Sequence, residues 1–163
     1  MNGSLGVISD THGLLRPEAV EALRGSELIV HAGDIGKPEV IDELERIAPV
    51  VACRGNVDTG DWAGRFAPSC ELEFAGRRIH LLHNISELAM DLAAHGFDAV
   101  ICGHSHKPRV EHHGNVLHLN PGSAGPRRFK LPVSVARIRF VDGSLAAEIV
   151  ELEVPPPKGR KLR

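Results

Sequence analysis

The chain has 163 residues, 42% of them hydrophobic, which is enough for one domain with a sizeable core. Its 19 lysines and arginines against 21 aspartates and glutamates give a net charge of −2, which argues against a protein that coats nucleic acid by bulk charge. Three cysteines without a CxxC pair argue against a disulfide framework and a cysteine-type zinc site. Because no signal-peptide pattern and no membrane-length apolar stretch occurs, we expect a cytoplasmic protein with no membrane partner.

The first half of the chain alternates strand and helix patterns. Apolar runs predict strands at residues 5–8, 27–31 and 49–53, and helical spacing predicts helices at 17–23 and 38–47. A loop at 57–69 follows. We then expect two strands joined by a turn, at 70–74 and 78–82. A helix at 86–95, with Ser86 as its N-cap, and a buried strand at 98–102 should follow.

The second half of the chain predicts hairpin strands at 109–113, 116–119, 133–141 and 145–152. Strand–helix alternation followed by hairpins is typical of a two-sheet α/β sandwich. We expect one domain over residues 1–154. Pro155, Pro156 and Pro157, followed by basic residues, predict a flexible Pro-rich basic tail at 155–163.

Polar side chains follow five of the predicted strands, at the point where each strand ends: Asp10, Asp34, Asn56, His83 and His104. Each has an ordinary interpretation by itself, such as a turn, a cap or a packed histidine. In α/β sheets, however, ligands gather beyond the carboxyl ends of the strands. Strands of one sheet would therefore bring these side chains to a common edge, which predicts a functional site there.

The residue types at this edge indicate metal chemistry. With His12 and His106, which lie two residues after Asp10 and His104, the set contains two aspartates, one asparagine and four histidines. Imidazoles suit Zn, Mn, Fe, Co or Ni, and carboxylates neutralise positive charge. We therefore expect two adjacent divalent transition metal ions as cofactors.

The order of these motifs, DxH, GD, GN, H and GHxH, resembles the calcineurin-like metallophosphoesterases, and more narrowly their small single-domain phosphodiesterases from bacteria and archaea. The similarity runs from about Leu5 to Leu152. It is carried by the strings Gly-Val-Ile-Ser-Asp-Thr-His-Gly, His-Ala-Gly-Asp, Arg-Gly-Asn-Val-Asp, Gly-His-Ser-His-Lys-Pro and Asn-Pro-Gly-Ser. The resemblance implies a four-layer αββα sandwich of two mixed β-sheets flanked by helices.

The resemblance also implies how the ligands are shared between two metals. One metal would be held by Asp10, His12, Asp34 and His106, and the other by Asp34, Asn56, His83 and His104, with Asp34 as the bridge. Asp34, Asn56 and His104 would serve catalysis by holding the metals, and a hydroxide between the metals would attack phosphorus in line. Manganese is the first choice of metal, with Fe, Zn, Ni or Co as alternatives.

Two positions depart from the wider family pattern. Val57 stands where many members have a histidine that binds phosphate or protonates the leaving group, so we expect slow reaction of esters that need strong acid assistance. Asn84 stands where glycine is more usual. Further residues are placed to orient ligands or contact phosphate, with turn capping or surface pairing as the alternatives: His31, Arg54, Asp58 and Asn120.

The sequence therefore predicts a metal-dependent phosphohydrolase, most simply a phosphodiesterase acting on a small phosphodiester or nucleotide-like substrate. Two alternatives remain open. One is a non-catalytic scaffold, because the fold also occurs in a protein-binding retromer subunit; the other is a phosphomonoesterase or nuclease using the same metals. Relatives of this size are often homodimers or homotetramers, so the resemblance implies that this chain can form either assembly.

Overall fold

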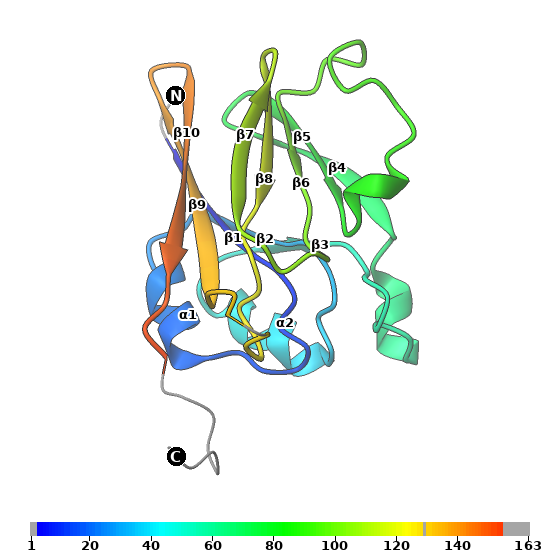
Figure 1. The fold of residues 1–163 in the computed structure, drawn as a ribbon, viewed down its shortest axis with the longest axis vertical. Coiled ribbons are helices and arrows are strands. Elements are labelled where there is room, and N and C mark those ends of the chain that lie inside the picture. The colour runs from blue at the N-terminus through cyan, green and yellow to red at the C-terminus, as the bar shows by residue number, and fades with distance from the viewer. Residues whose placement is uncertain (1–2, 129, 155–163) are drawn as a thin grey trace.

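Two five-stranded β-sheets packed face to face form the body of the molecule (Figure 1). The computed structural model describes residues 3–128 and 130–154. The first sheet has the order β10-β9-β1-β2-β3 and the second β4-β5-β6-β8-β7. Both are mixed, so the predicted two-sheet α/β sandwich is confirmed. The predicted tail at 155–163 lies outside the described residues, and no helix among those described is long and apolar enough to cross a membrane.

The first sheet is parallel on one side of β1 and antiparallel on the other. Its strands are β1 (Gly3–Ile8), β2 (Leu28–His31), β3 (Val50–Ala52), β9 (Ser134–Val141) and β10 (Ser144–Glu151). β1 pairs in parallel with β2, and β2 with β3, whereas β9 runs antiparallel to β1. The carboxyl ends of β1, β2 and β3 therefore lie along one edge.

The second sheet is parallel at its centre and antiparallel at both edges. Its strands are β4 (Ser69–Phe74), β5 (Arg77–Leu82), β6 (Ala99–Ile101), β7 (Arg109–His113) and β8 (Val116–Asn120). β5, β6 and β8 are parallel neighbours, so their carboxyl ends also lie together. The turn between β4 and β5 has only two residues, Ala75 and Gly76, both with positive φ, as a tight hairpin requires.

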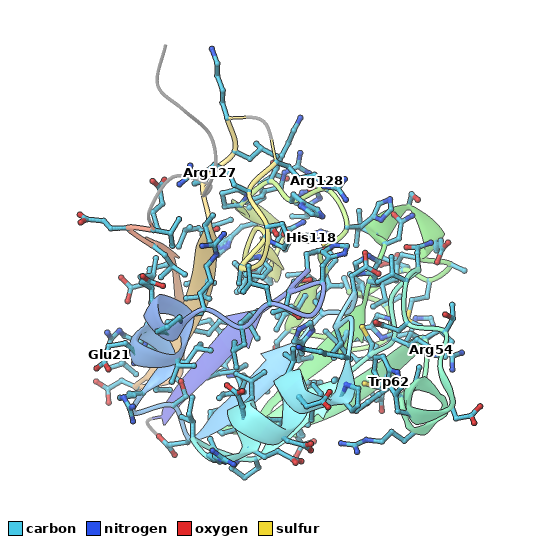
Figure 2. The ribbon with its side chains drawn as sticks, turned by 90° about the horizontal axis from the view of Figure 1, so that it is seen from below. Glu21, Arg54, Trp62, His118, Arg127 and Arg128 are labelled. Carbon is cyan, nitrogen blue, oxygen red and sulfur yellow. The ribbon has the colours of Figure 1, made fainter. Side chains whose placement is uncertain are left out.

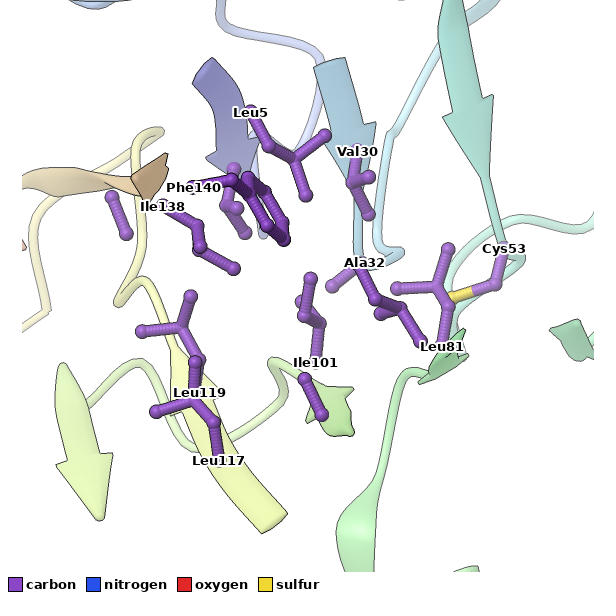
Figure 3. Close-up of a cluster of buried hydrophobic side chains, with 14 residues drawn as sticks. Leu5, Val30, Ala32, Cys53, Leu81, Ile101, Leu117, Leu119, Ile138 and Phe140 are labelled. Carbon is purple, nitrogen blue, oxygen red and sulfur yellow. The ribbon is translucent and has the colours of Figure 1, made fainter. Parts of the chain in front are cut away.

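The main core lies between the two sheets (Figure 3). Side chains of the first sheet, among them Leu5, Val30 and Phe140, face Leu81 and Ile101 of the second, and all five are almost fully buried. Each such side chain contributes about 1.5–3 kcal/mol through burial. This packing fixes the two sheets against each other, and with them the strand ends that carry the polar motifs.

Two short helices cover the outer face of the first sheet. α1 (Pro17–Leu23) and α2 (Pro38–Glu45) both begin with a proline, whose missing N–H has no partner to lose at that position. Leu23 and Ile41 bury their side chains in a cluster that includes Ile29 of β2. The helix predicted at residues 38–47 is confirmed as α2, although it ends two residues earlier than expected, at Glu45.

The helix predicted at residues 86–95 is not formed. The chain makes a 3₁₀ turn, η2 (Ile85–Glu87), and continues as irregular turns; a second 3₁₀ segment, η1 (Asp61–Arg65), lies in the predicted loop at 57–69. The side chain that caps η2 is Asn84, not Ser86, because Asn84 Oδ1 accepts a hydrogen bond from the Ser86 N–H at 3.1 Å. A ten-residue helix is marginal in water, so tertiary contacts decide here over propensity. The outer layer of the second sheet is correspondingly thin.

Candidate metal centre

The candidate ligands come from the ends of strands in both sheets. Asp10 follows β1, Asp34 follows β2 and Asn56 follows β3, whereas His83 follows β5 and His104 follows β6. The Asp10 N–H donates to the Gly33 carbonyl and the His12 N–H to the Asp34 carbonyl, which ties the first two loops together. The Gly103 N–H donates to the His83 carbonyl and ties the loops of the second sheet. Loops far apart in sequence therefore meet at one edge.

Five candidate ligands lie within a few ångströms of one another. Asp10 Oδ1 lies 3.3 Å from Nε2 of His106, 3.7 Å from Nε2 of His12 and 3.8 Å from Nε2 of His83. Asp34 Oδ2 lies 3.1 Å from Nε2 of His83 and 3.7 Å from Nε2 of His12. Two groups could each hold a cation, Asp10–His12–His106 and Asp10–Asp34–His83. Both carboxylates thus lie between histidines of the two groups.

In each of the two carboxylates, one oxygen accepts hydrogen bonds from the surrounding loops, and the other oxygen faces the histidines. Asp10 Oδ2 accepts from the Ser9 hydroxyl at 2.7 Å and from the His104 N–H at 3.1 Å, and Asp34 Oδ1 accepts from the Val57 N–H at 3.1 Å. The remaining oxygens, Asp10 Oδ1 and Asp34 Oδ2, are the ones nearest the histidines. The chain therefore orients two carboxylate oxygens toward a common space.

Buried polar atoms without partners mark the same space. Within the described part of the chain, Asp10 Oδ1, His12 Nε2 and His83 Nε2 are buried and accept or donate no hydrogen bond. A buried polar atom without a partner costs about 1–3 kcal/mol, so such a cluster calls for an explanation. Carboxylate oxygens and imidazole nitrogens facing one another are the donor set that a divalent transition metal takes, and the residues present fit that group.

The backbone at the site is strained. Five candidate ligands have left-handed φ values between 47° and 73°: Asp10, His12, Asp34, His104 and His106. The other non-glycine residues with positive φ in the described ranges, Ala75 and Asp142, occupy hairpin turns. Left-handed backbone costs free energy in non-glycine residues and persists where the surroundings impose it. Its concentration at these five positions is typical of a functional site.

The carboxylates and the buried histidine polarise one another. Burial alone would raise the pKa of Asp10, but the adjacent His106 and His12 rings and the Ser9 hydroxyl outweigh it and hold this pKa well below its ordinary value. Burial would likewise lower the pKa of His83, but Asp34 and Asp10 raise it above its ordinary value. His83 Nδ1–H donates to the Ala32 carbonyl at 2.8 Å, which leaves Nε2 directed at the carboxylates. The site therefore favours positive charge.

His31, one of the predicted orienting residues, is completely buried behind the ligands. Its Nδ1 accepts from the Gly33 N–H at 3.1 Å and its Nε2–H donates to Thr11 Oγ at 3.0 Å, and Thr11 in turn donates to the Ile35 carbonyl at 2.8 Å. Burial lowers the pKa of His31 to about 4, so its ring is neutral. His31 thus connects the loops of Asp10 and Asp34 rather than contacting a ligand.

Asp58 and Asn120 also act through the backbone. Asp58 accepts N–H donors from Ile35, Gly36 and Gly55 at 2.9–3.1 Å, which joins the Asp34 loop to the Asn56 loop. Asn120 donates to the Gly103 carbonyl at 2.9 Å and to Ser105 Oγ at 3.2 Å.

The remaining predicted residues are placed at the rim. Asn56 and His104 are exposed, and the His104 ring centroid lies 5.2 Å from that of His83. Arg54, Asn56 and His83 line a shared cavity of about 160 Å³. Arg54 does not pair with Asp58, and it forms no ion pair within the described ranges. Figure 2 shows Arg54 with Trp62 on one side of this end of the molecule and His118 with Arg127 and Arg128 on another.

Sequence reasoning missed two residues that hold Asp10. Ser9 donates to its carboxylate, and Ser123 Oγ donates to its backbone carbonyl at 3.0 Å. Both lie inside the strings that carry the family resemblance, Ser9 directly before Asp10 and Ser123 at the end of Asn-Pro-Gly-Ser. That placement is the signal that could have identified them.

Comparison with known proteins agrees with this geometry. Residues 4–143 match the model of the calcineurin-like phosphoesterase superfamily domain. The chain belongs to this superfamily. A probable metallophosphoesterase from Methanothermobacter thermautotrophicus is 37% identical, covering 93% of this chain and 94% of the relative. A phosphodiesterase from Methanocaldococcus jannaschii is 30% identical, covering 72% and 82%.

The superfamily fold is shared with proteins named for other roles. The structure of vacuolar protein sorting 29 from Cryptosporidium parvum superimposes with a TM-score of 0.73, at 20% identity and over 94% of this chain and 99% of that one. At this identity the likeness shows the fold alone. The family match over residues 4–143 establishes membership of the calcineurin-like phosphoesterases, and the chemistry of this member has to be argued from its own residues.

Proposed function

We propose that this chain is a phosphodiesterase that works with two divalent transition metal ions at the Asp10–Asp34 centre. The observation that carries the proposal is the set of unpartnered buried atoms, Asp10 Oδ1, His12 Nε2 and His83 Nε2, that face one another. The relative that is 30% identical and named a phosphodiesterase supports the choice of a diester. Bound metals would supply an activated water and offset negative charge on the phosphoryl group.

The residues of the chain prepare the site for this chemistry. Ser9 and the His104 N–H hold one oxygen of Asp10, and the Val57 N–H holds one oxygen of Asp34, so the open oxygens keep their positions. In this proposal Asp34 would be the ligand shared by the two metals, as the family resemblance implies, and its Oδ2 lies near both His12 and His83. Asn56 and His104 complete the second metal site from the exposed side, where a substrate can approach.

The proposal is tested with protein stripped of metal by a chelator and reloaded with Mn. Hydrolysis of bis(p-nitrophenyl) phosphate and of p-nitrophenyl phosphate is compared between apo and reloaded protein. We expect turnover that depends on Mn and is faster for the diester. Two tightly bound metals without turnover of either ester, in Mn and in the alternative metals, would overturn the proposal in favour of a binding scaffold.

Val57 supports a diester over a monoester substrate. Its side chain is 47% exposed, its N–H holds Asp34, and a valine side chain cannot transfer a proton to a leaving group. We expect Val57→His to raise monoesterase activity relative to diesterase activity, by about tenfold or more if the imidazole acts as a general acid. The exposed position lets the fold accommodate the ring. The measurement is the ratio of kcat/KM for the two esters; an unchanged ratio would show that position 57 does not control leaving-group protonation.

A further inference from the structure

A second cavity, of about 230 Å³, adjoins the metal centre on the outer face of the second sheet. Asn84 and Ile85 form one wall, and Cys102, His118 and Leu119 of the sheet side form another. The cavity reaches His104, a candidate metal ligand, so a molecule bound there would lie next to the reacting phosphate. The cavity lies where the outer layer of the second sheet is thin, because β5 is followed by the short turn η2 and not by a long helix that would cover the sheet.

The charge around this cavity is positive. Lys107 and Arg109 both line it and are exposed, and no aspartate or glutamate is among the described residues that line it. Lys107 forms no ion pair within the described ranges. Arg109 Nε lies 3.4 Å from the Glu111 carboxylate. The same carboxylate also lies 3.0 Å from His113 Nε2, so the negative charge of Glu111 is shared between the two residues. The cavity therefore attracts a negatively charged group beyond the one held at the metal centre.

Lys107 lies on the loop that also carries metal ligands, and Arg109 begins β7 directly after that loop. His104 and His106 directly precede Lys107, and the Lys107 N–H donates to Ser105 Oγ at 3.2 Å. Asn120 binds the same Ser105 Oγ and the Gly103 carbonyl, and its own Oδ1 accepts from the Gly122 N–H at 2.9 Å. This network fixes the backbone at Ser105 and Lys107, next to the metal centre, and the exposed side chains of Lys107 and Arg109 extend from there.

The walls of the cavity suit a ring. Ile85 supplies apolar surface, and His118 presents a half-buried imidazole that is stacked on His113 with a centroid distance of 4.0 Å. A planar group can add to such a stack, and polar atoms of Asn84 and Ser105 lie at its edge. A small cavity that combines apolar surface, polar groups and a cationic margin is suited to a nucleotide.

We infer that this cavity binds the non-reacting part of a phosphodiester substrate and that this part is a nucleoside carrying an additional phosphate. Lys107 and Arg109 would bind the additional phosphate, and His118 would contact the base or sugar. The inference rests on the proposed function, because it assigns a substrate class to the same centre. The inference goes beyond the proposed function by predicting that a second negative charge on the substrate raises kcat/KM.

The test uses two diesters that release the same p-nitrophenolate from Mn-loaded protein. One is the p-nitrophenyl ester of thymidine 5′-phosphate, and the other is the same ester with an added 3′-phosphate. We expect kcat/KM to be about tenfold higher for the second ester, as a charge-assisted contact provides. Lys107→Ala and Arg109→Ala should bring this ratio close to one. Arg139→Ala is the control, because Arg139 is an exposed cation on β9 that pairs with Glu148, and it should keep both the ratio and the activity.

A binding measurement separates the two hypotheses. Calorimetry should show thymidine 3′,5′-bisphosphate binding about tenfold more tightly than thymidine 5′-phosphate, and Lys107→Ala should remove the difference. Hydrolysis of both esters at equal kcat/KM, with equal binding of both nucleotides, would overturn the inference and leave the phosphodiesterase proposal standing. Absence of hydrolysis of either ester would overturn the proposed function, and the binding comparison would then decide whether the cavity selects the second phosphate.

Discussion

Asp34→Asn is expected to lower kcat/KM for the diester by about a thousandfold or more and to reduce bound metal below two ions per chain. Asp34 Oδ2 lies between His83 at 3.1 Å and His12 at 3.7 Å, and the other oxygen is held by the Val57 N–H. An amide keeps the size of the side chain but removes the negative charge that would offset two cations. The measurement combines steady-state kinetics with metal analysis of the purified protein.

The control for this substitution is Asp42→Asn on α2. Asp42 is also an aspartate in the first half of the chain, but it is exposed and lies outside the candidate metal groups. We expect its metal content and activity to match those of the original protein. Full metal occupancy and near-normal turnover in Asp34→Asn would contradict the assignment of Asp34 as a bridging ligand.

The second large effect is expected from Gly103→Ala. A Cβ atom at this position would overlap Ser9 Oγ and lie 2.6 Å from Asp10 Oδ2, and both of those side chains are buried. Neither can move without breaking the hydrogen bond by which Ser9 holds Asp10. We expect the free energy of unfolding to fall by about 1–3 kcal/mol, as overpacking typically costs, and metal affinity to fall with it.

The control for the glycine substitution is Gly64→Ala. A methyl group at Gly64 would have no neighbouring atom within 4 Å, and the φ of this residue is not in the left-handed region, so the substitution meets neither a clash nor strain. Urea denaturation and calorimetric titration with Mn are the measurements. If Gly103→Ala unfolds at the same urea concentration as Gly64→Ala and binds Mn equally, the close packing of the two sheets at this point is not required for the site.

The sequence indicated the candidate ligands because five of the seven follow predicted strands and because the order of the motifs resembles one family. Both signals can be read from the sequence without any knowledge of the fold. They did not show which carboxylate lies centrally. The resemblance assigns the bridge to Asp34, whereas in the structure both Asp10 and Asp34 lie between histidines of the two groups.

The strands and the hairpin turns were determined by the sequence itself, because alternation of apolar residues and positive-φ turn residues are properties of neighbouring positions. The segment at 86–95 shows the limit of such patterns. Its residues favour a helix, but a short helix gains little in water, and the contacts of Ile85 and Leu92 with the second sheet decide its path. The cavity beside His104 follows from that outcome.

Only the tertiary structure decided how His31, Asp58 and Asn120 act. Each was predicted near the site, and each proves to connect loops that are distant in sequence: His31 through the Thr11 hydroxyl, and Asp58 and Asn120 through backbone groups. The same holds for the open oxygens of Asp10 and Asp34, whose direction depends on donors from Ser9, His104 and Val57. The sequence by itself determined which side chains reach the edge of the sheets, since strand ends are local features. Their orientation came from the closure of the two sheets, because hydrogen bonds between separate loops exist only once the core has packed.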